Sequence, residues 1–262
     1  PSSGHRRRRR LVRPAHPRER HMNGAPVLQT VGLEKRFGGV HAIAGVDFSL
    51  AEGELRCLIG PNGAGKSTFF KMVTGQIAPT AGRIVFAGAD ITRAAAHEIG
   101  RLGIGIKNQV PDVFDGLTVR ENLWLAARRG NAIAATRQIV GELMERLQLA
   151  DIAQRSVGEL AHGQRQWVEI GMVLARQPRL VLLDEPSAGM SVEETNRTAA
   201  LIREVNKSTT MIVVEHDMQF IRQIATKVTV FHQGRILVED AFDRIMTNPA
   251  VRDVYLGRQA AA

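Results

Sequence analysis

The sequence of 262 residues has a single cysteine, Cys57, so an internal disulfide is excluded. This is typical of a protein from a reducing compartment. Cys57 lies in the strand-like run 54–59, and we expect a small buried core residue rather than a reactive thiol. The sequence also lacks any apolar run near the roughly 18 residues that span a bilayer. Its longest apolar runs, 180–183 and 211–214, have the length of buried strands, which predicts a soluble or peripheral protein.

Acidic residues are almost absent from the first 22 residues, which hold eight arginines and one acid, Glu19. This segment carries +7 of the formal net charge of +9, so the rest of the chain is nearly neutral. An arginine run can bind phosphates, but no apolar core of about 7–15 residues follows it, so a secretory signal is not expected. We interpret residues 1–25 as a disordered basic leader, typical of an expression vector, with a native start at Met22. No nucleic-acid partner is expected.

The remaining residues, 26–262, alternate between strand-like and helix-like runs, which predicts an α/β domain. Several strand-like runs are continuously apolar, as in sheets covered on both faces. The expected strands are 46–50, 55–59, 83–87, 103–107, 180–183, 211–214, 228–231 and 235–238, and the expected helices are 66–74, 193–206 and 216–224. Three further helices, 118–129, 134–149 and 163–177, predict a helical insert in the core at about 108–176.

The sequence contains a P-loop motif, Gly60-Pro61-Asn62-Gly63-Ala64-Gly65-Lys66-Ser67-Thr68, between an expected strand and an expected helix. Its glycines let backbone amides point inward at phosphate oxygens, and the start of the helix adds partial positive charge. Lys66 would reach the β- and γ-phosphates, and Ser67 would offer its hydroxyl to Mg²⁺. Alone, the motif indicates a nucleoside triphosphate site and no more.

Two acids, Asp184 and Glu185, follow the apolar run 180–183. A buried parallel strand delivers such residues to the carboxyl edge of the sheet, where ligands bind in open α/β folds. Asp184 is placed to hold Mg²⁺, and Glu185 is placed to orient or deprotonate the attacking water. An acid pair alone would more often be a solvated strand end, but a P-loop about 120 residues upstream favours the catalytic interpretation.

The segment Leu160-Ala161-His162-Gly163-Gln164 precedes an amphipathic helix. With the P-loop, it resembles the signature of ABC ATPases, usually Leu-Ser-Gly-Gly-Gln. The resemblance covers roughly residues 27–257 and implies an α/β P-loop NTPase of the ABC ATPase fold, with a RecA-like core, an antiparallel β subdomain and an inserted α-helical subdomain. It also implies that residues 161–164 contact the ATP held by a second ATPase subunit, so that two ATPs lie between two chains.

Other family elements follow in order along the chain. Gln109 resembles the Q-loop glutamine, His216 the switch histidine that contacts the γ-phosphate, and Phe37 the aromatic residue that stacks on adenine. Residues 187–190 resemble the D-loop. The resemblance implies ATP and Mg²⁺ as cofactors, catalytic roles for Lys66, Gln109, Glu185 and His216, and Mg²⁺ ligation by Ser67, Gln109 and Asp184.

Three positions depart from the family pattern. Ala161 replaces the usual signature serine, so a hydroxyl toward the partner's γ-phosphate is missing. Ser191 stands where the D-loop often ends in aspartate, and Asn108 stands where an aromatic is common. We therefore expect competent hydrolysis of the ATP bound to this chain and a weaker signature for the partner's ATP.

Residues 162–172 resemble ATP-binding subunits of urea importers, which belong with the branched-chain amino acid importers, and 214–218 and 254–257 resemble that wider group. The resemblance implies a homo- or heterodimer with a second ATPase subunit, two transmembrane permease subunits and, indirectly, a periplasmic solute-binding protein, at the cytoplasmic face of the inner (plasma) membrane. We expect uptake of urea or short amides, with branched-chain amino acids as the alternative. Trp167 has a second interpretation, as a residue that packs its helix onto neighbouring helices.

Two other functional classes stay open. A soluble ABC protein acting on nucleic acid usually carries two cassettes or a long coiled-coil insertion, whereas this sequence has one cassette and a short insert. A non-catalytic nucleotide sensor is disfavoured by the intact Lys66, Glu185 and His216, although Ala161 leaves partial degeneracy open.

Overall fold

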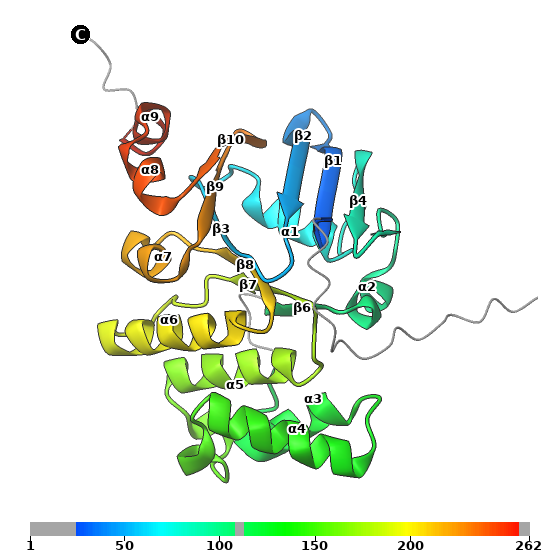
Figure 1. Ribbon diagram of the computed structural model, residues 1–262, viewed down its shortest axis with the longest axis vertical. Coiled ribbons are helices and arrows are strands. Elements are labelled where there is room, and N and C mark those ends of the chain that lie inside the picture. Colours follow the sequence, from blue (N-terminus) through cyan, green and yellow to red (C-terminus); the bar gives the residue numbers. More distant parts are fainter. Residues whose placement is uncertain (1–24, 108–112, 257–262) are drawn as a thin grey trace, which may run out of the picture.

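The computed structural model describes residues 25–107 and 113–256, with only the backbone of Leu256, and its elements form two sheets with helices around them (Figure 1). One sheet has the strand order β10-β9-β3-β8-β7-β6, and the other has the order β2-β1-β4-β5. The strands are β1 Leu28–Phe37, β2 Val40–Leu50, β3 Leu55–Ile59, β4 Ala81–Phe86, β5 Ala89–Asp90, β6 Ile104–Lys107, β7 Leu180–Asp184, β8 Thr210–Val214, β9 Lys227–His232 and β10 Arg235–Asp240. The helices are α1 Lys66–Val73, α2 Ala96–Leu102, α3 Val119–Arg128, α4 Ile133–Arg146, α5 His162–Leu174, α6 Val192–Asn206, α7 Met218–Ile224, α8 Phe242–Thr247 and α9 Pro249–Leu256, with short 3₁₀ turns at Ala150–Ile152 and Val157–Glu159.

The strands of the six-stranded sheet are parallel except β10, which pairs with β9 in antiparallel fashion. Successive side chains of its central strands enter two different cores, because side chains alternate across a sheet. In β7, Val181 and Leu183 face the core that includes α3 to α7, while Leu180 and Leu182 face the core shared with α1 and the antiparallel sheet. This double coverage explains the continuously apolar runs in the sequence and confirms the expected α/β layout.

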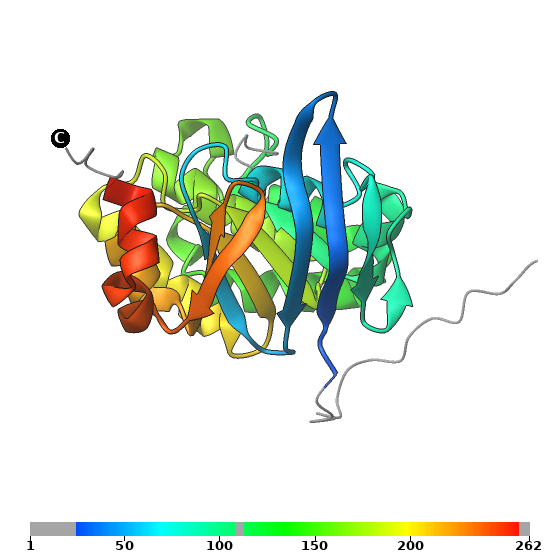
Figure 2. The ribbon, with the colours of Figure 1, turned by 90° about the horizontal axis from the view of Figure 1, so that it is seen from above.

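The four-stranded sheet lies beside the first and is antiparallel throughout (Figure 2). Its first strand, β1, was not among the strands expected from the sequence. The register of β1 against β2 shifts between Thr30 and Leu33, and Gly32 has a φ of +55°. The irregular backbone breaks the simple alternation of buried and exposed residues by which a strand is predicted.

The helices α3, α4 and α5 lie together at one end of the molecule (Figure 1). The start of α3 is a capping box, as the sequence predicts: the N–H of Glu121 donates to Thr118 Oγ1 over 3.2 Å, and the N–H of Thr118 donates to the Glu121 carboxylate over 2.8 Å. Asn122 is buried and its amide bonds the carbonyls of Phe114 and Leu117, which fixes the turn before the helix. Within the described ranges, no helix has both the length and the apolar character needed to cross a membrane.

The helix expected at 216–224 begins two residues later, at Met218. Asp217 is its N-cap, and the Asp217 carboxylate accepts hydrogen bonds from the N–H groups of Gln219 and Phe220 over 2.8 and 3.2 Å. His216 therefore stays in the loop between β8 and α7. Cys57 is buried in β3, as expected, and burial raises the pKa of its thiol.

Candidate functional site

The P-loop connects β3 to α1 in a conformation that requires glycine at two positions. Gly60 has a φ of +147°, and a Cβ there would meet the carbonyl oxygen of Phe231 at 2.2 Å. Gly65, the N-cap of α1, has a φ of +107°, and a Cβ there would meet the carbonyl oxygen of Ala42 at 2.7 Å. At both positions the loop backbone packs directly against the backbone of a neighbouring strand, so only glycine fits, and the loop leads into the start of α1 as a phosphate-binding loop does.

Lys66, the first residue of α1, folds back over the loop. Its ammonium donates to the carbonyl oxygens of Gly60 and Pro61 over 2.6 and 3.1 Å. Burial lowers the pKa of Lys66, while the charges of Glu185 and Asp184 raise it. Lys66 thus lies within electrostatic reach of both predicted acids, and phosphate oxygens can replace the two carbonyls as its partners.

Asp184 and Glu185 come from the end of β7, at the carboxyl edge of the parallel sheet. Burial, and then the charge of Glu185, raise the pKa of Asp184, against the lowering effect of Lys107 and Lys66. Glu185 has a φ of +47°, which is unusual for a residue with a side chain, and its N–H donates to the carbonyl of Val214 over 2.9 Å. This bond joins Glu185 to the last residue of the neighbouring strand β8, two residues before His216.

His216 is brought to Glu185 by the pairing of β7 with β8. Its Nδ1 lies 3.4 Å from Glu185 Oε1, and its imidazole is 70% exposed. Lys66, Asp184, Glu185 and His216 therefore gather at one edge of the sheet, although 150 residues separate the first from the last. The structure brings together four of the residues that the sequence singled out, in an arrangement suited to phosphoryl transfer to water.

Ser67 and Thr68 follow Lys66 in the first turn of α1, with Ser67 exposed. The Ser67 hydroxyl and the Asp184 carboxylate, at the end of β7, are the kinds of oxygen ligand that Mg²⁺ prefers. The residues present therefore fit a Mg–nucleotide complex. Phe37 ends β1 with half of its surface exposed, and Lys35 Nζ lies 5.0 Å from the centre of its ring. Gln109 and Asn108 lie outside the described residues.

The signature residues lie at the start of α5. Ala161 is the N-cap and has no side-chain oxygen to accept a hydrogen bond; Gln164 reaches back to the N–H of Ala161 over 3.3 Å. The exposed His162 ring has Nε2 3.0 Å from the carbonyl oxygen of Ala188, in the predicted D-loop. A Cβ at Gly163 would meet the Glu194 carboxylate of α6 at 2.4 Å, so the end of the Glu194 side chain would have to move to admit one.

Trp167 is buried between α5 and α6. Its indole N–H donates to Thr198 Oγ1 over 2.9 Å, and the guanidinium of Arg197 lies 3.9 Å from the ring centre. These contacts confirm the second interpretation of Trp167, that it packs the signature helix onto its neighbour.

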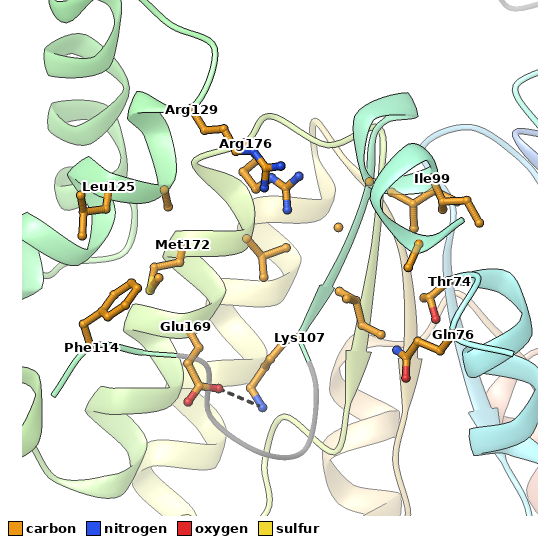
Figure 3. Close-up of a pocket in the computed structure, with 17 residues that line it drawn as sticks. Thr74, Gln76, Ile99, Lys107, Phe114, Leu125, Arg129, Glu169, Met172 and Arg176 are labelled. Carbon is orange, nitrogen blue, oxygen red and sulfur yellow. Dashed lines mark ion pairs between the residues drawn. The ribbon is translucent and has the colours of Figure 1, made fainter. Parts of the chain in front are cut away.

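A cavity of about 470 Å³ lies where β6 and α2 face α3 and α5 (Figure 3). Its walls carry apolar side chains, among them Ile99, Phe114 and Met172. Arg129 and Arg176 lie side by side at its rim (Figure 3), and burial and the charge of Arg129 lower the pKa of Arg176. The sequence predicts a helical insert here but carries no signal for this apolar cavity, called the groove below, with two arginines at its rim.

Two sets of buried charged residues were missed by the sequence analysis. Lys107 at the end of β6 forms a buried ion pair with Glu169 of α5, with Nζ and Oε2 3.5 Å apart (Figure 3). Glu215, directly after β8, is a buried carboxylate that accepts hydrogen bonds from the N–H groups of Ser187 and His216. In both cases the only sequence signal was a charged residue next to an apolar run, and such residues are usually solvated strand ends.

Comparison with known proteins gives consistent results. The family model "ABC transporter" matches residues 43–188. The branched-chain amino acid transport ATP-binding protein BraF of Pseudomonas aeruginosa is 36% identical over 88% of this chain and 98% of its own length. LivG of Escherichia coli, of the same description, is 34% identical over 88% of this chain and 98% of its own length.

Among solved structures, the ADP conformation of an ATP-binding cassette of an ABC transporter aligns with a TM-score of 0.80 at 29% identity, over 88% of this chain and 99% of that one. The fold is therefore that of an ABC cassette, with the antiparallel sheet and helical parts expected from the sequence. With its phosphate loop and catalytic edge in place, the chain belongs to the ABC transporter family as an ATP-binding and ATP-hydrolysing subunit.

Proposed function

We propose that this chain powers the import of branched-chain amino acids through separate permease subunits. The observation that carries the ATPase mechanism is the gathering of Lys66, Asp184, Glu185 and His216 at one edge of the parallel sheet. The solute class is supported by the two relatives, whose names give branched-chain amino acid transport and which match nearly their whole length. The proposed location is the cytoplasmic face of the inner membrane, where the chain would be a peripheral subunit.

Urea, the first expectation from the sequence, has weaker support. That expectation rested on residues 162–172, with Trp167 as the most distinctive residue. The contacts of Trp167 with Thr198 and Arg197 give it a packing role within the chain, so it carries little information on the transported solute. Branched-chain amino acids, the alternative from the sequence, are therefore preferred.

The nucleotide would be held from three sides. The amides of residues 60–68 and the ammonium of Lys66 would bind the phosphates, and Phe37 would stack on the adenine. Ser67 and Asp184, with Gln109, would hold Mg²⁺, which when bound neutralises charge on the phosphate oxygens. Hydrolysis then depends on the two groups beside the γ-phosphate, Glu185 and His216.

Glu185 would accept a proton from the attacking water as the water oxygen forms its bond to the γ-phosphorus. The bond from this phosphorus to the bridging oxygen of ADP breaks at the same time, and inorganic phosphate and ADP are the products. The imidazole of His216 would donate a hydrogen bond to the γ-phosphate, from a position fixed against Glu185. The His216 side chain is largely exposed, so a bound nucleotide could approach its imidazole.

A second ATPase subunit, identical or related, would complete each site. Residues 161–164 at the start of α5 would contact the γ-phosphate of the ATP held by that partner, since the amino end of a helix favours anions. Residues 26–262 would form one ATPase unit, with the segment of about 108–176 as its inserted helical subdomain. A periplasmic solute-binding protein would act on the complex only through the permeases.

The groove between β6 and α5 is the proposed contact for a permease. Its apolar walls suit a short helix from a permease subunit, and the adjacent Arg129 and Arg176 at the rim favour an acidic residue on that helix. Movement of the permease helix would be transmitted to both β6 and α5, because the ion pair of Lys107 with Glu169 joins the two elements at the base of the groove (Figure 3).

Replacing Arg129 and Arg176 by Glu is expected to weaken permease binding about tenfold or more, because like charges would then face each other across the contact. The measurement is the affinity of the chain for its detergent-solubilised permeases. Arg137→Glu is the matched control, since Arg137 is an exposed arginine of α4 and does not line the groove. Unchanged affinity of the double variant would remove the groove from the permease contact.

Replacing Ala161 by Ser is expected to stabilise the chain by about 1 kcal/mol, because Ala161 is an extended N-cap without a side-chain acceptor. It is also expected to raise turnover of the partner's ATP about two- to tenfold, through one new hydrogen bond to phosphate. Ala132→Ser is the matched control: Ala132 is the uncapped, extended N-cap of α4, so it should gain the stability without the turnover. Equal turnover of both variants would contradict the role of the signature.

The proposed function is tested by ATPase measurements on the complex of this chain with its permeases and second ATPase subunit in proteoliposomes. We expect stimulation by leucine with its binding protein, and none by urea with its own. Stimulation by urea alone would move the solute assignment to urea or short amides and leave the hydrolytic mechanism intact. Stimulation by neither solute, with basal hydrolysis present, would contradict both solute assignments.

A further inference from the structure

Glu215 is a buried carboxylate that the mechanism above does not use. It follows β8 directly, and its side chain is 0% exposed. One oxygen accepts the N–H and the hydroxyl of Ser187, over 2.9 and 2.5 Å. The other accepts the N–H groups of His216 and Asp217, over 3.0 and 3.5 Å. A buried charge is retained only where it is compensated, and here four donors from two loops compensate it.

The two loops joined by Glu215 carry the catalytic pair. Ser187 lies two residues after Glu185, and His216 is the next residue after Glu215 itself. The distance of 3.4 Å between His216 Nδ1 and Glu185 Oε1 therefore depends on how these two backbones are held together. The pairing of β7 with β8 ends at Asp184 and Val214. Just beyond it, the N–H of Glu185 donates to the Val214 carbonyl, and Glu215 supplies further bonds between the two loops.

The link continues from Ser187 to the signature. The next residue, Ala188, has its carbonyl oxygen 3.0 Å from His162 Nε2, and Gly189 lies against the same ring, where a Cβ would be 3.3 Å from Nε2. The turn 187–190 therefore contacts the His162 ring at the start of α5, whose Nε2 also lies 3.2 Å from Gln166 Nε2 of the same helix. A single buried carboxylate thus connects the edge that serves this chain's own ATP with the signature that serves the partner's.

We propose that Glu215 is a positioning residue for ATP hydrolysis, which holds the His216 loop and the turn 187–190 in one arrangement, including the contact of that turn with His162. The proposal rests on the catalytic assignments of Glu185 and His216 in the proposed function. It assigns to Glu215 no contact with nucleotide, since four protein donors surround its oxygens.

Glu215→Gln keeps the shape of the side chain but turns an amide N–H₂ toward one pair of donors. We expect kcat for ATP hydrolysis by the full chain to fall about tenfold or more, with the dissociation constant for ATP within about twofold of the wild type. Ser187→Ala removes only the hydroxyl donor, and kcat is expected to fall about threefold. Ser187→Thr keeps the hydroxyl and is expected to restore the wild-type kcat.

The double variant Ser187→Ala with Glu215→Gln separates a shared role from two independent ones. If both residues act through their hydrogen bond, its kcat should match that of Glu215→Gln within about twofold. Glu239→Gln is the matched control: Glu239 is a partly buried carboxylate of β10 that accepts a hydrogen bond from Thr229 over 2.6 Å and pairs with Arg56, and it belongs to neither of the two loops that Glu215 joins. We expect Glu239→Gln to lower the melting temperature and leave kcat unchanged.

A kcat of Glu215→Gln within twofold of the wild type would overturn the proposal. A fall in kcat accompanied by equal falls in ATP affinity and in the yield of folded protein would also overturn it, because that pattern indicates lost stability alone. So would a double variant whose loss of kcat is the product of the two single losses. Where Glu215→Gln does not fold, the Ser187 variants decide, because wild-type kcat in Ser187→Ala would overturn the proposal on its own. A wild-type chain without hydrolysis would instead contradict the proposed function before any variant is compared.

Discussion

Replacing Glu185 by Gln is expected to lower kcat about 10²–10⁴-fold, because the amide cannot accept the proton of the attacking water. Binding of ATP should persist, since Lys66 and the loop at 60–68 are untouched. In the proposed two-chain site the γ-phosphate contacts both chains, so a dimer of two ATP-bound chains should accumulate while the ATP stays uncleaved. The measurements are phosphate release under saturating ATP and the size of the complex in solution with Mg-ATP.

The control for this variant is Glu193→Gln. Glu193 is an exposed acid in the first turn of α6, close to the same loop in sequence but outside the catalytic edge. We expect its turnover and its monomer–dimer equilibrium to match the wild type. Normal turnover in Glu185→Gln would exclude Glu185 as the base and direct attention to His216 instead.

Replacing Lys107 by Met is expected to lower the free energy of unfolding by about 3–5 kcal/mol, because it leaves the Glu169 carboxylate buried without its ion-pair partner. The side chains of Lys107 and Glu169 are 2% and 5% exposed. Burial lowers the pKa of Lys107 and raises the pKa of Glu169, and the partner's charge opposes each shift. The charge of each residue thus favours the charged form of the other, and the loss should be measured by urea denaturation.

Two controls separate burial from charge. Replacing both members, Lys107→Met with Glu169→Leu, should recover most of the loss, since two apolar side chains of similar size replace the buried pair. Lys207→Met breaks the exposed pair of Lys207 with Glu204 and should cost about 1 kcal/mol or less. A loss below about 1 kcal/mol in Lys107→Met, or a double variant less stable than the single one, would contradict the claim that an unpaired Glu169 carboxylate causes the loss.

The residues of the nucleotide site were predictable because their signals are local. A P-loop needs glycines and a lysine at fixed spacing. The apolar run 180–183 predicts a buried strand, and Asp184 and Glu185 follow it directly. The structure places these residues and His216 at one sheet edge, where the strand pairing of β7 with β8 predicts them. The α/β fold with its antiparallel sheet and helical part was predictable in the same way, through periodicity and family motifs.

The parts that sequence reasoning missed depend on contacts between distant residues. Glu215 follows the apolar run 211–214, where a solvated acid is common, and two of the four donors that bond its carboxylate come from Ser187, 28 residues upstream. The pairing of Lys107 with Glu169 joins residues from β6 and α5, and neither segment shows it alone. The helix α2 was not predicted because it buries only Ile99, which leaves no apolar stripe to recognise.

The measurement that tests the catalytic claim most directly is phosphate release per chain as a function of chain concentration, with Mg-ATP, for this chain alone and mixed with its second ATPase subunit. In the proposed shared site each ATP contacts the signature of another chain, so we expect the rate per chain to rise with concentration until dimers dominate. A rate per chain that does not depend on concentration, or no hydrolysis in either mixture, would contradict a shared site built from the P-loop of one chain and the signature of the other.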